Sequence, residues 1–445
     1  MLSVPAVLRI PDSPGTAFEP GAGPSPGRKR QIKEQEVGLY ETLEERGFVA
    51  QCTDVEGLKD LLARETVTAY IGFDPTASSL HVGSLLPIMS LAHLQRAGHR
   101  PIGLVGGGTG LVGDPSGKTE MRKMLSREDI DANGEGLKTQ LSRFIDFSED
   151  RALMLNNADW LCEWNYIEFL RDIGKHFSIN RMLSYESVKS RLDSESGLSF
   201  IEFNYMLLQA YDFYHQALHY DCRLQMGGND QWGNITAGID LTRRLGGPQL
   251  YGLTFPLITT SSGKKMGKTE TGTVWLDAER TSPYDYYQFW RNTEDADVGR
   301  FLSFFTYLDM DEVRELSALE GSEINRAKLV LAYEATRLNH GREEADKAKA
   351  AAEAAFGQGR AADEVPTVTI SPKEFSEMAA FQLFVRAGLC STGSEARRLI
   401  SQGGAYVEDR KVRAFDQPVK ELLQAEGSLI RAGKKRFKRV VVAPE

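Results

Sequence analysis

A histidine, a glycine and a serine lie where a run of alternating apolar residues gives way to a polar turn and then to a helical period, at His81, Gly83 and Ser84. The pattern predicts a strand, a loop and a helix that is capped by the serine pair at 78–79 and ends at Gly98. An imidazole in the first turn of a helix could hold a polyphosphate and stabilise charge that develops on it. HVGS is a weak signal by itself, and a solvated or capping histidine is the alternative.

A second reactive group lies far downstream, in a loop rich in glycine, serine, threonine and lysine over residues 257–277. Lys265 and Lys268 flank Met266 and Gly267 there. Two ammonium groups on such a loop suit a clamp that meets a leaving pyrophosphate as negative charge moves onto it. A basic loop that is simply solvated is the alternative for this stretch taken alone.

The two motifs together are much more specific than either one. HVGS and KMGKT resemble the HIGH and KMSKS signatures of class I aminoacyl-tRNA synthetases, and the stretches 70–83, 105–120, 203–213 and 224–235 resemble bacterial tyrosyl-tRNA synthetases. The resemblance extends from about residue 39 to about residue 442. Two departures are Ser84 in place of a second histidine and Gly-Lys-Thr in place of Ser-Lys-Ser. The motif residues are His81, Val82, Gly83, Ser84, Lys265, Met266, Gly267, Lys268 and Thr269.

Tyr205, Gln209 and Asp212 follow one another at steps of four and three, so they share one helix face. From the spacing alone, these three side chains could instead form a solvent-exposed polar face of the helix. The resemblance implies that Tyr205 and Gln209 hold the amino end of tyrosine, while Asp212 and Tyr70 bind its phenolic hydroxyl. A pocket built this way would reject phenylalanine, because two buried polar groups would lose their partner. The full tyrosine-binding set expected is Tyr70, Asp114, Tyr205, Gln209, Asp212 and Gln225.

The glycine-rich segment 105–119 contains the spacing G-x-G-x-x-G at Gly108, Gly110 and Gly113. A dinucleotide fingerprint fits poorly, because an Asp-Pro-Ser-Gly run at 114–117 interrupts the helix that should follow. A P-loop fails because Val112 stands where glycine is required. We interpret the segment as a substrate wall, and the resemblance implies that Asp114 binds the α-ammonium group of the substrate.

The resemblance also implies the reaction and the phosphate contacts. Tyrosine would react with ATP to give tyrosyl-adenylate, and the tyrosyl group would then pass to the 3′ end of tRNA(Tyr), with ATP as a substrate and Mg²⁺ accompanying it. The expected catalytic residues are Thr76, His81, Lys265 and Lys268. The expected ATP and adenylate contacts are Gly72, Asp74, His81, Gly83, Gly228, Asp230, Gln231 and Lys268. No resident metal is expected, because HQALH at 215–219 lacks the glutamate of a zinc protease helix.

The length of 445 residues predicts two or three domains, and a hydrophobic content of 41% is that of an ordinary globular chain. The expected fold class is α/β: a Rossmann-like parallel-sheet catalytic domain, then an α-helical domain and a small α+β RNA-binding domain. The expected segments are a disordered N-terminal extension (1–33), a Rossmann-like catalytic domain (34–260), the lysine loop and linker (261–280), an α-helical anticodon-side domain (281–356), a linker (357–375) and an S-four-like RNA-binding domain (376–445).

The distribution of charge indicates the kind of partner, and the cysteine content indicates the cellular compartment. The net charge is −9, but the last 70 residues carry 13 Lys and Arg against 8 Asp and Glu. The expected RNA-binding residues there are Arg386, Arg397, Arg398, Lys434, Lys435 and Arg436. Four scattered cysteines and no membrane span or signal peptide predict reduced thiols and a cytoplasmic protein.

Two rival functions remain open from the sequence. An RNA-binding or splicing-cofactor protein on the same scaffold would keep the C-terminal domain without the chemistry, and intact motifs weigh against it. A tryptophanyl-type synthetase would share both motifs, but it would not need the pairing of Tyr70 with Asp212. A homodimer is expected from the resemblance only, and the N-terminal extension is either an over-long gene start or an arm that contacts RNA.

Overall fold

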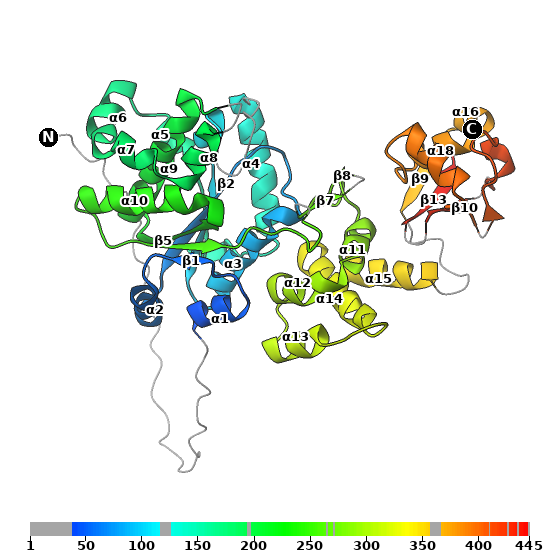
Figure 1. The fold of residues 1–445 in the computed structure, drawn as a ribbon, viewed down its shortest axis with the longest axis horizontal. Coiled ribbons are helices and arrows are strands. Elements are labelled where there is room, and N and C mark those ends of the chain that lie inside the picture. Colours follow the sequence, from blue (N-terminus) through cyan, green and yellow to red (C-terminus); the bar gives the residue numbers. More distant parts are fainter. Residues whose placement is uncertain are drawn as a thin grey trace, which may run out of the picture. The chain divides into compact units, whose positions relative to one another are not determined.

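Figure 1 shows a computed structural model of the chain. The residues that it describes are 38–115, 126–193, 197–263, 266–269, 272–356, 366–408, 410–424, 427–433 and 436–443. The expected N-terminal extension lies outside them, and so do Lys265, Lys434 and Lys435. The description of Lys268 and Thr269 is limited to their backbone.

A six-stranded sheet forms the centre of the catalytic part, in the strand order β1-β6-β5-β2-β3-β4. All neighbours pair in parallel except β1, which is antiparallel to β6. The strands are β1 (Gln51–Cys52), β2 (Thr68–Phe73), β3 (Arg100–Val105), β4 (Leu153–Asn156), β5 (Cys222–Gly228) and β6 (Tyr251–Phe255). This arrangement confirms the expected Rossmann-like parallel sheet.

Helices cover both faces of this sheet (Figure 1). α3 packs on one face against β2 and β3, whereas α9 and α10 pack on the other face against β5 and against each other. The helices of this part are α1 (Leu39–Glu45), α2 (Val55–Arg64), α3 (Leu85–Arg96), α4 (Arg127–Leu141), α5 (Ala158–Leu161), α6 (Tyr166–Asp172), α7 (Ile179–Met182), α8 (Glu186–Leu192), α9 (Phe200–His219) and α10 (Trp232–Arg244).

The alternation of side chains along β2 decides what faces the site. Ala69, Ile71 and Phe73 enter the core on the α3 side. Tyr70 points to the opposite face, where its ring lies edge-on to Phe213 of α9, with the ring centroids 5.4 Å apart. Successive side chains of a strand must point to opposite faces, so one tyrosine in an apolar strand is delivered to the α9 side.

The strand order also predicts where a ligand should bind. The chain runs from β2 outward through β3 and β4, and it then returns to place β5 on the other side of β2. Strand order reverses between β2 and β5, and open α/β sheets bind ligands at the carboxyl ends of the strands that flank such a point.

The α-helical part shares one hydrophobic core with the catalytic part. Phe48, after α1, packs edge-on against Phe304 of α12 with ring centroids 5.3 Å apart. Ser282 caps the first helix of this part and Pro283 occupies its first turn, a pair of residue types that favours the start of a helix. The helices are α11 (Pro283–Arg291), α12 (Val298–Phe305), α13 (Met310–Ser317), α14 (Ile324–His340) and α15 (Arg342–Phe356).

The C-terminal part has its own core and a five-stranded sheet in the order β11-β10-β12-β13-β9. Its first strand lies inside the stretch that we expected to be a linker, because the alternating sequence TVTI pairs in parallel with β13. The elements are β9 (Thr367–Ile370), α16 (Pro372–Glu377), α17 (Ala380–Arg386), α18 (Gly393–Ser401), β10 (Ala405–Val407), β11 (Arg410–Lys411), β12 (Ser428–Ala432) and β13 (Arg436–Val442).

Among the helices that the structure describes, none combines the length and the apolar character that crossing a bilayer requires. All four cysteines lie in described segments, and each has a free thiol.

Candidate active site

A cavity of about 160 Å³ opens at the carboxyl ends of β2 and β5, where the strand order reverses. Its walls come from β2, the loop after β3, α9 and β5. Ten of the residues expected from the sequence line it: Tyr70, Gly72, Asp74, Asp114, Tyr205, Gln209, Asp212, Gln225, Gly228 and Gln231. The site therefore assembles from segments that lie far apart in the chain, from Tyr70 to Gln231.

One side of the cavity carries a buried phenol and a buried carboxyl group. Tyr70 is 1% exposed and Asp212 is 2% exposed. Asn157 Nδ2 donates to Asp212 Oδ2 at 2.8 Å, and Trp160 Nε1 donates to Asp212 Oδ1 at 2.7 Å. The Tyr70 hydroxyl has no hydrogen-bond partner among the described residues. Because buried hydroxyl groups are normally paired, this group indicates a polar ligand.

Burial controls the ionisation of this pair. It raises the pKa of Asp212 to about 7, against the opposing effect of the hydrogen bonds from Asn157 and Trp160. Burial, followed by the charge of Asp212, raises the pKa of Tyr70 well above its ordinary value. Tyr70 is therefore a neutral phenol at physiological pH. Together the pair can accept a hydrogen bond from a ligand hydroxyl and donate one to it.

A polar network links three of the expected residues in another part of the cavity. Gln231 Nε2 donates to Asp114 Oδ2 at 2.8 Å, and Gln209 Nε2 donates to Gln231 Oε1 at 3.2 Å. Asn234 Nδ2 donates to Gln209 Oε1 at 3.0 Å. A carboxylate held among amides can bind an ammonium group, so this part of the cavity is chemically distinct from the phenol end.

Sequence reasoning missed four polar residues of this region: Thr109, Asn157, Trp160 and Asn234. Asn157 links Thr109 to Asp212, because its Nδ2 also donates to Thr109 Oγ1 at 2.9 Å. A signal for Asn157 and Trp160 was present, since both lie just after β4, at the edge of the sheet where ligands gather. Their role as donors to Asp212 depends on contacts that sequence spacing does not reveal.

The HVGS segment begins its helix differently from the prediction. The serines at 78–79 do not cap it, because Ser79 Oγ donates to the carbonyl oxygen of Leu80 at 2.8 Å. A short 3-10 turn over Val82–Ser84 precedes α3, and His81 is its N-cap. His81 Nδ1 accepts from the backbone N–H of Gly83 at 3.0 Å. A neutral imidazole with this bond carries its proton on Nε2, as a hydrogen-bond donor to phosphate must.

The two signature motifs are in direct contact. A β-carbon built on Gly267 would lie 2.7 Å from Val82 Cγ2, and Gly267 has φ of +81°. A β-carbon on Gly83 would lie 3.2 Å from the carbonyl oxygen of Met266. Glycine at position 267, where the family signature has serine, is thus required by both backbone conformation and space.

Four of the expected catalytic and ATP-contact residues that the structure describes do not line the cavity: Thr76, His81, Gly83 and Asp230. The lysine positions cannot be compared with it, since Lys265 and the side chain of Lys268 lie outside the described part of the chain. All the residues expected to bind tyrosine therefore line one cavity, whereas only some of those expected to contact ATP do so.

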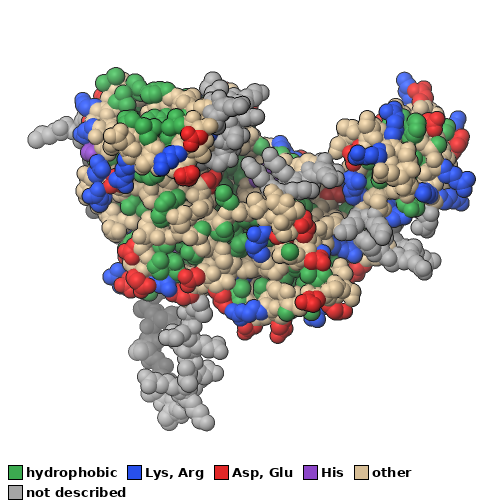
Figure 2. All heavy atoms as spheres, viewed as in Figure 1, with side chains coloured by type: hydrophobic (Ala, Val, Ile, Leu, Met, Phe, Trp, Pro, Cys, Tyr) green, Lys and Arg blue, Asp and Glu red, His purple; other side chains and the backbone are tan. Residues whose placement is uncertain are grey.

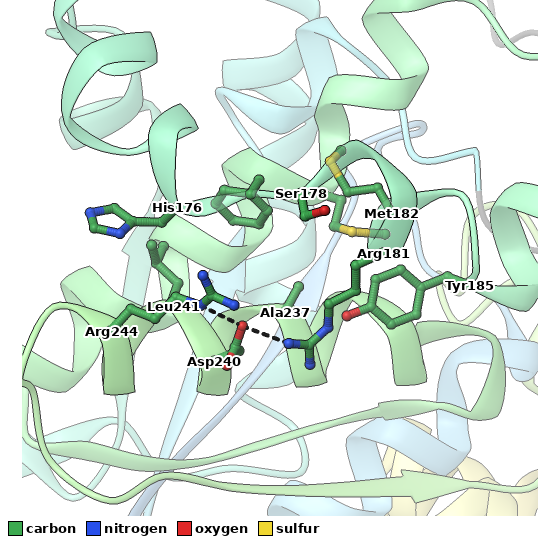
Figure 3. Close-up of a pocket in the computed structure, with 11 residues that line it drawn as sticks. His176, Ser178, Arg181, Met182, Tyr185, Ala237, Asp240, Leu241 and Arg244 are labelled. Atoms are coloured by element: carbon green, nitrogen blue, oxygen red, sulfur yellow. Dashed lines mark hydrogen bonds and ion pairs between the residues drawn. The ribbon is translucent and has the colours of Figure 1, made fainter.

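A second, shallow hollow of about 20 Å³ lies between α7, α9 and α10 (Figure 3). Asp240 accepts there from Arg181 at 2.9 Å, from Arg243 at 2.7 Å and from Arg244 at 2.8 Å. One carboxylate among three guanidinium groups leaves a positive surplus on this surface.

The expected RNA-binding arginines differ in how they are held. Arg386 forms an ion pair with Glu374 at 2.9 Å, and Arg436 donates to a backbone carbonyl at 2.8 Å. The guanidinium of Arg397 lies 3.9 Å from the centre of a phenylalanine ring, on the exposed side of α18. Arg398 is also exposed. Arg397 and Arg398 thus present their charge to solvent from one helix.

Comparisons with known proteins agree along the chain. The family described as "tRNA synthetases class I (W and Y)" matches residues 62–357, and the family described as "Tyrosine--tRNA ligase SYY-like C-terminal domain" matches residues 358–440. A tyrosine–tRNA ligase of Desulfatibacillum aliphaticivorans is 56% identical over 430 residues, covering 92% of this chain and 99% of that protein. A Clostridium botulinum (strain Hall) tyrosine–tRNA ligase is 56% identical over 407 residues, covering 91% and 99%.

Solved structures agree as well. A C-terminally truncated mitochondrial tyrosyl-tRNA synthetase of Aspergillus nidulans superposes with a TM-score of 0.62 at 31% identity, covering 72% of this chain and 94% of that one. The tyrosyl-tRNA synthetase of Archaeoglobus fulgidus, solved with L-tyrosine, shares the fold with a TM-score of 0.53 at 18% identity, covering 70% of this chain and 99% of that one. The buried phenol–carboxyl pair, the contact between the two motifs and these matches lead to one conclusion: the chain belongs to the class I tRNA synthetases and, among them, to the tyrosine–tRNA ligases.

Proposed function

We propose that the cavity between β2 and β5 binds L-tyrosine with its phenol at Tyr70 and Asp212, and that tyrosine is activated where the cavity meets the HVGS segment. The observation that carries this proposal is the Tyr70 hydroxyl, fully buried beside a carboxyl group and without a partner among the described residues. A ligand phenol can donate to Asp212 and accept from Tyr70 at the same time. Phenylalanine would leave the Tyr70 hydroxyl without a partner and Asp212 without the donor that the ligand supplies, so it should be rejected.

The opposite end of the ligand meets the polar network. The α-ammonium group of tyrosine would lie near Asp114, with Tyr205 and Gln209 beside it. Gln225 would support the pocket from β5. The Asp114 carboxylate supplies the charge that a buried ammonium group needs, and the amides fix its direction. The carboxylate of tyrosine would then point out of the cavity toward ATP.

In the first step, a carboxylate oxygen of tyrosine attacks the α-phosphorus of ATP, the bond from that phosphorus to pyrophosphate breaks, and tyrosyl-adenylate forms. No side-chain nucleophile takes part. Thr76, His81, Lys265 and Lys268 would stabilise the charge that moves onto pyrophosphate. The adenylate contacts that we propose are Gly72, Asp74, Gly83, Gly228, Asp230 and Gln231.

Magnesium is treated as part of the ATP substrate. Among the described residues, no three His, Cys, Asp or Glu side chains are grouped as a metal site would require. We propose that the triphosphate oxygens hold the ion, as Mg²⁺ commonly binds through substrate phosphates.

In the second step, a hydroxyl of the terminal ribose of tRNA(Tyr) attacks the carbonyl carbon of the adenylate, and AMP leaves. The C-terminal part would hold the tRNA through phosphate contacts, in which we assign the leading role to Arg397 and Arg398 because both are exposed. Such contacts make the affinity for tRNA decrease as salt increases. We also propose that the protein works in the cytoplasm, where ATP and tRNA are available.

A homodimer is the assembly that we propose, through an apolar surface over α6–α9. Figure 2 shows hydrophobic side chains gathered over this region. Phe200 is 71% exposed and Ile167 is 67% exposed. Seven of the ten large hydrophobic side chains that are exposed in the described residues belong to it: Tyr166, Ile167, Ile179, Leu183, Leu192, Phe200 and Ile201. Apolar surface of this extent is typical of an interface.

Phe200→Asp tests the dimer. Position 200 is the first residue of α9, where an acidic group suits the helix N-terminus, so the helix should survive the change. Light scattering after size exclusion should give a dimer for the unchanged protein and a monomer for the variant. Leu218→Lys, at an exposed leucine that is not one of these seven and lies in the last turn of α9, where a cation suits the helix, is the matched control and should remain a dimer. A monomeric unchanged protein would contradict the assembly.

The catalytic assignment is tested by separating tyrosine binding from phosphate chemistry. In tyrosine-dependent exchange of labelled pyrophosphate into ATP, Lys268→Ala and His81→Asn should each lower kcat by about 100-fold while the KM for tyrosine stays near normal. Tyr70→Phe should instead raise the KM for tyrosine by about 10-fold, because a buried hydrogen bond to the ligand is lost. The assignment is wrong if Lys268→Ala keeps its rate and loses tyrosine affinity.

A further inference from the structure

The segment that follows the lysine loop is paired with the HVGS segment by backbone hydrogen bonds. Val82 N–H donates to the carbonyl oxygen of Val274 at 3.0 Å, and Leu276 N–H donates to that of Leu80 at 2.9 Å. These two bonds form an antiparallel bridge in which His81 lies directly opposite Trp275. The bonds are made by the flanking residues, so His81 and Trp275 are a non-hydrogen-bonded pair, the kind whose side chains lie closest.

The two side chains meet edge to face. Their ring centroids are 6.2 Å apart and their planes make an angle of 61°. His81 is thus held by two contacts, one from Trp275 and one from the Gly83 N–H that binds its Nδ1. The first restricts the orientation of the ring and the second selects the tautomer. Trp275 itself is half-buried.

Arg280 also contacts the Trp275 ring. Its guanidinium lies 4.7 Å from the centre of the Trp275 ring, and its Nη2 donates to Ser78 Oγ at 2.6 Å. The backbone N–H of Trp275 also donates to Thr281 Oγ1 at 2.9 Å. Arg280 therefore joins the segment before HVGS to the indole that faces His81.

Trp275 also lies at the foot of the hairpin that carries Lys268. Val274 N–H donates to the carbonyl oxygen of Gly267 at 2.9 Å, and β7 (Lys268–Thr269) pairs with β8 (Gly272–Thr273) just beyond. Trp275 thus contacts His81 and directly follows the backbone hairpin that contains Lys268.

We propose that Trp275 is a positioning residue that sets the ring of His81 for activation, and that Arg280 keeps Trp275 in place. The proposal rests on the role assigned to His81 above. Trp275 does not line the tyrosine cavity, so its loss should change the rate of activation and leave tyrosine binding intact. A pair of this kind corresponds to about a 10-fold effect on kcat.

The test is a double-mutant cycle in pyrophosphate exchange, with the full-length protein. Trp275→Leu should lower kcat by about 10-fold with the KM for tyrosine unchanged, and Trp275→Phe should recover most of the rate because an aromatic edge returns. In a His81→Asn background, Trp275→Leu should lower kcat by less than about two-fold, because its effect passes through the imidazole. Trp164→Leu is the matched control. It removes an indole from a similar edge-on pair, 5.8 Å from Phe169, and should leave kcat unchanged.

Three results would overturn the proposal: full activity of Trp275→Leu, an equal loss in both backgrounds, or a loss confined to the KM for tyrosine. Arg280→Ala, which retains the indole but removes the guanidinium group that contacts it, provides a second cycle if Trp275→Leu does not fold, and it should show the same dependence on His81. If the unchanged protein exchanges pyrophosphate but His81→Asn has no effect on kcat, the role assigned to His81 is wrong, and the role of Trp275 that depends on it is wrong as well. An unchanged protein without exchange would refute the proposed function itself.

Discussion

The change in stability that Asp212→Asn causes in the ligand-free protein should be more favourable in alkaline solution than in acid. The same substitution should remove tyrosine binding. Asp212 is 2% exposed, and burial raises the pKa of its carboxyl group to about 7 from its ordinary value of 3.8. A raised pKa in the folded state means that the stabilising effect of the proton is complete below the unfolded pKa. It is lost as pH rises through the window from 3.8 to about 7.

The size of the effect follows from the width of this window. Stability changes by about 1.36 kcal/mol for each pH unit over which the unfolded chain has lost the proton and the folded protein keeps it. From about pH 5.5 to the folded-state pKa the interval is about 1.5 units, which gives about 2 kcal/mol between pH 5.5 and pH 8.5. Asparagine does not titrate. It also turns an amide donor toward Asn157 or Trp160, at a cost of about 1 to 3 kcal/mol that is the same at every pH.

Comparing the two pH values therefore separates the contribution of Asp212 ionisation from the cost of the substitution that is the same at every pH. The free energy of unfolding in urea would be measured for both proteins, without tyrosine, at about pH 5.5 and about pH 8.5. The difference between variant and unchanged protein should be about 2 kcal/mol more favourable to the variant at the higher pH. Groups common to both proteins cancel in this difference. An equal effect of the substitution at both pH values would show that Asp212 ionises normally, and the reasoning about the buried pair would be refuted.

Three further predictions test other contacts. Trp160→Phe removes the indole donor to Asp212, so the KM for tyrosine should rise by about 10-fold with that for ATP unchanged, as steady-state exchange kinetics would reveal. Gly267→Ser restores the family signature but places a β-carbon 2.7 Å from a valine methyl group at φ of +81°, so exchange should slow by about 10-fold. Glu202→Gln removes the ion pair with Arg191 at 2.9 Å, in which both side chains are buried, so urea unfolding should report a loss of about 3 kcal/mol.

The sequence was most informative where a local pattern fixes the geometry. The alternation in β2 is enough to deliver Tyr70 to the face opposite Ile71, and the spacing of Tyr205, Gln209 and Asp212 is enough to put all three on one side of α9. Each of these side chains lines the cavity, because the positions depend on strand and helix periods that tertiary contacts leave intact. The capped start of α11 was predictable for the same reason.

It was less informative where long-range contacts decide. Ser79 is a good helix cap by residue type, but its hydroxyl group donates to a neighbouring carbonyl and His81 takes the N-cap position. Asn157 and Trp160 reach Asp212 from 55 and 52 residues away, and no local pattern marks such donors. The strand β9 was interpreted as linker because four residues become a strand only through pairing with β13.

The most direct test of the account is the choice between amino acids in pyrophosphate exchange by the unchanged protein, without tRNA. Tyrosine, phenylalanine and tryptophan would be compared at equal concentration. The pairing of Tyr70 with Asp212 predicts exchange with tyrosine and none detectable with the other two, because only a phenol satisfies both buried groups. Comparable exchange with phenylalanine would contradict the assignment of this pair, and exchange with tryptophan in place of tyrosine would contradict the pocket as a whole.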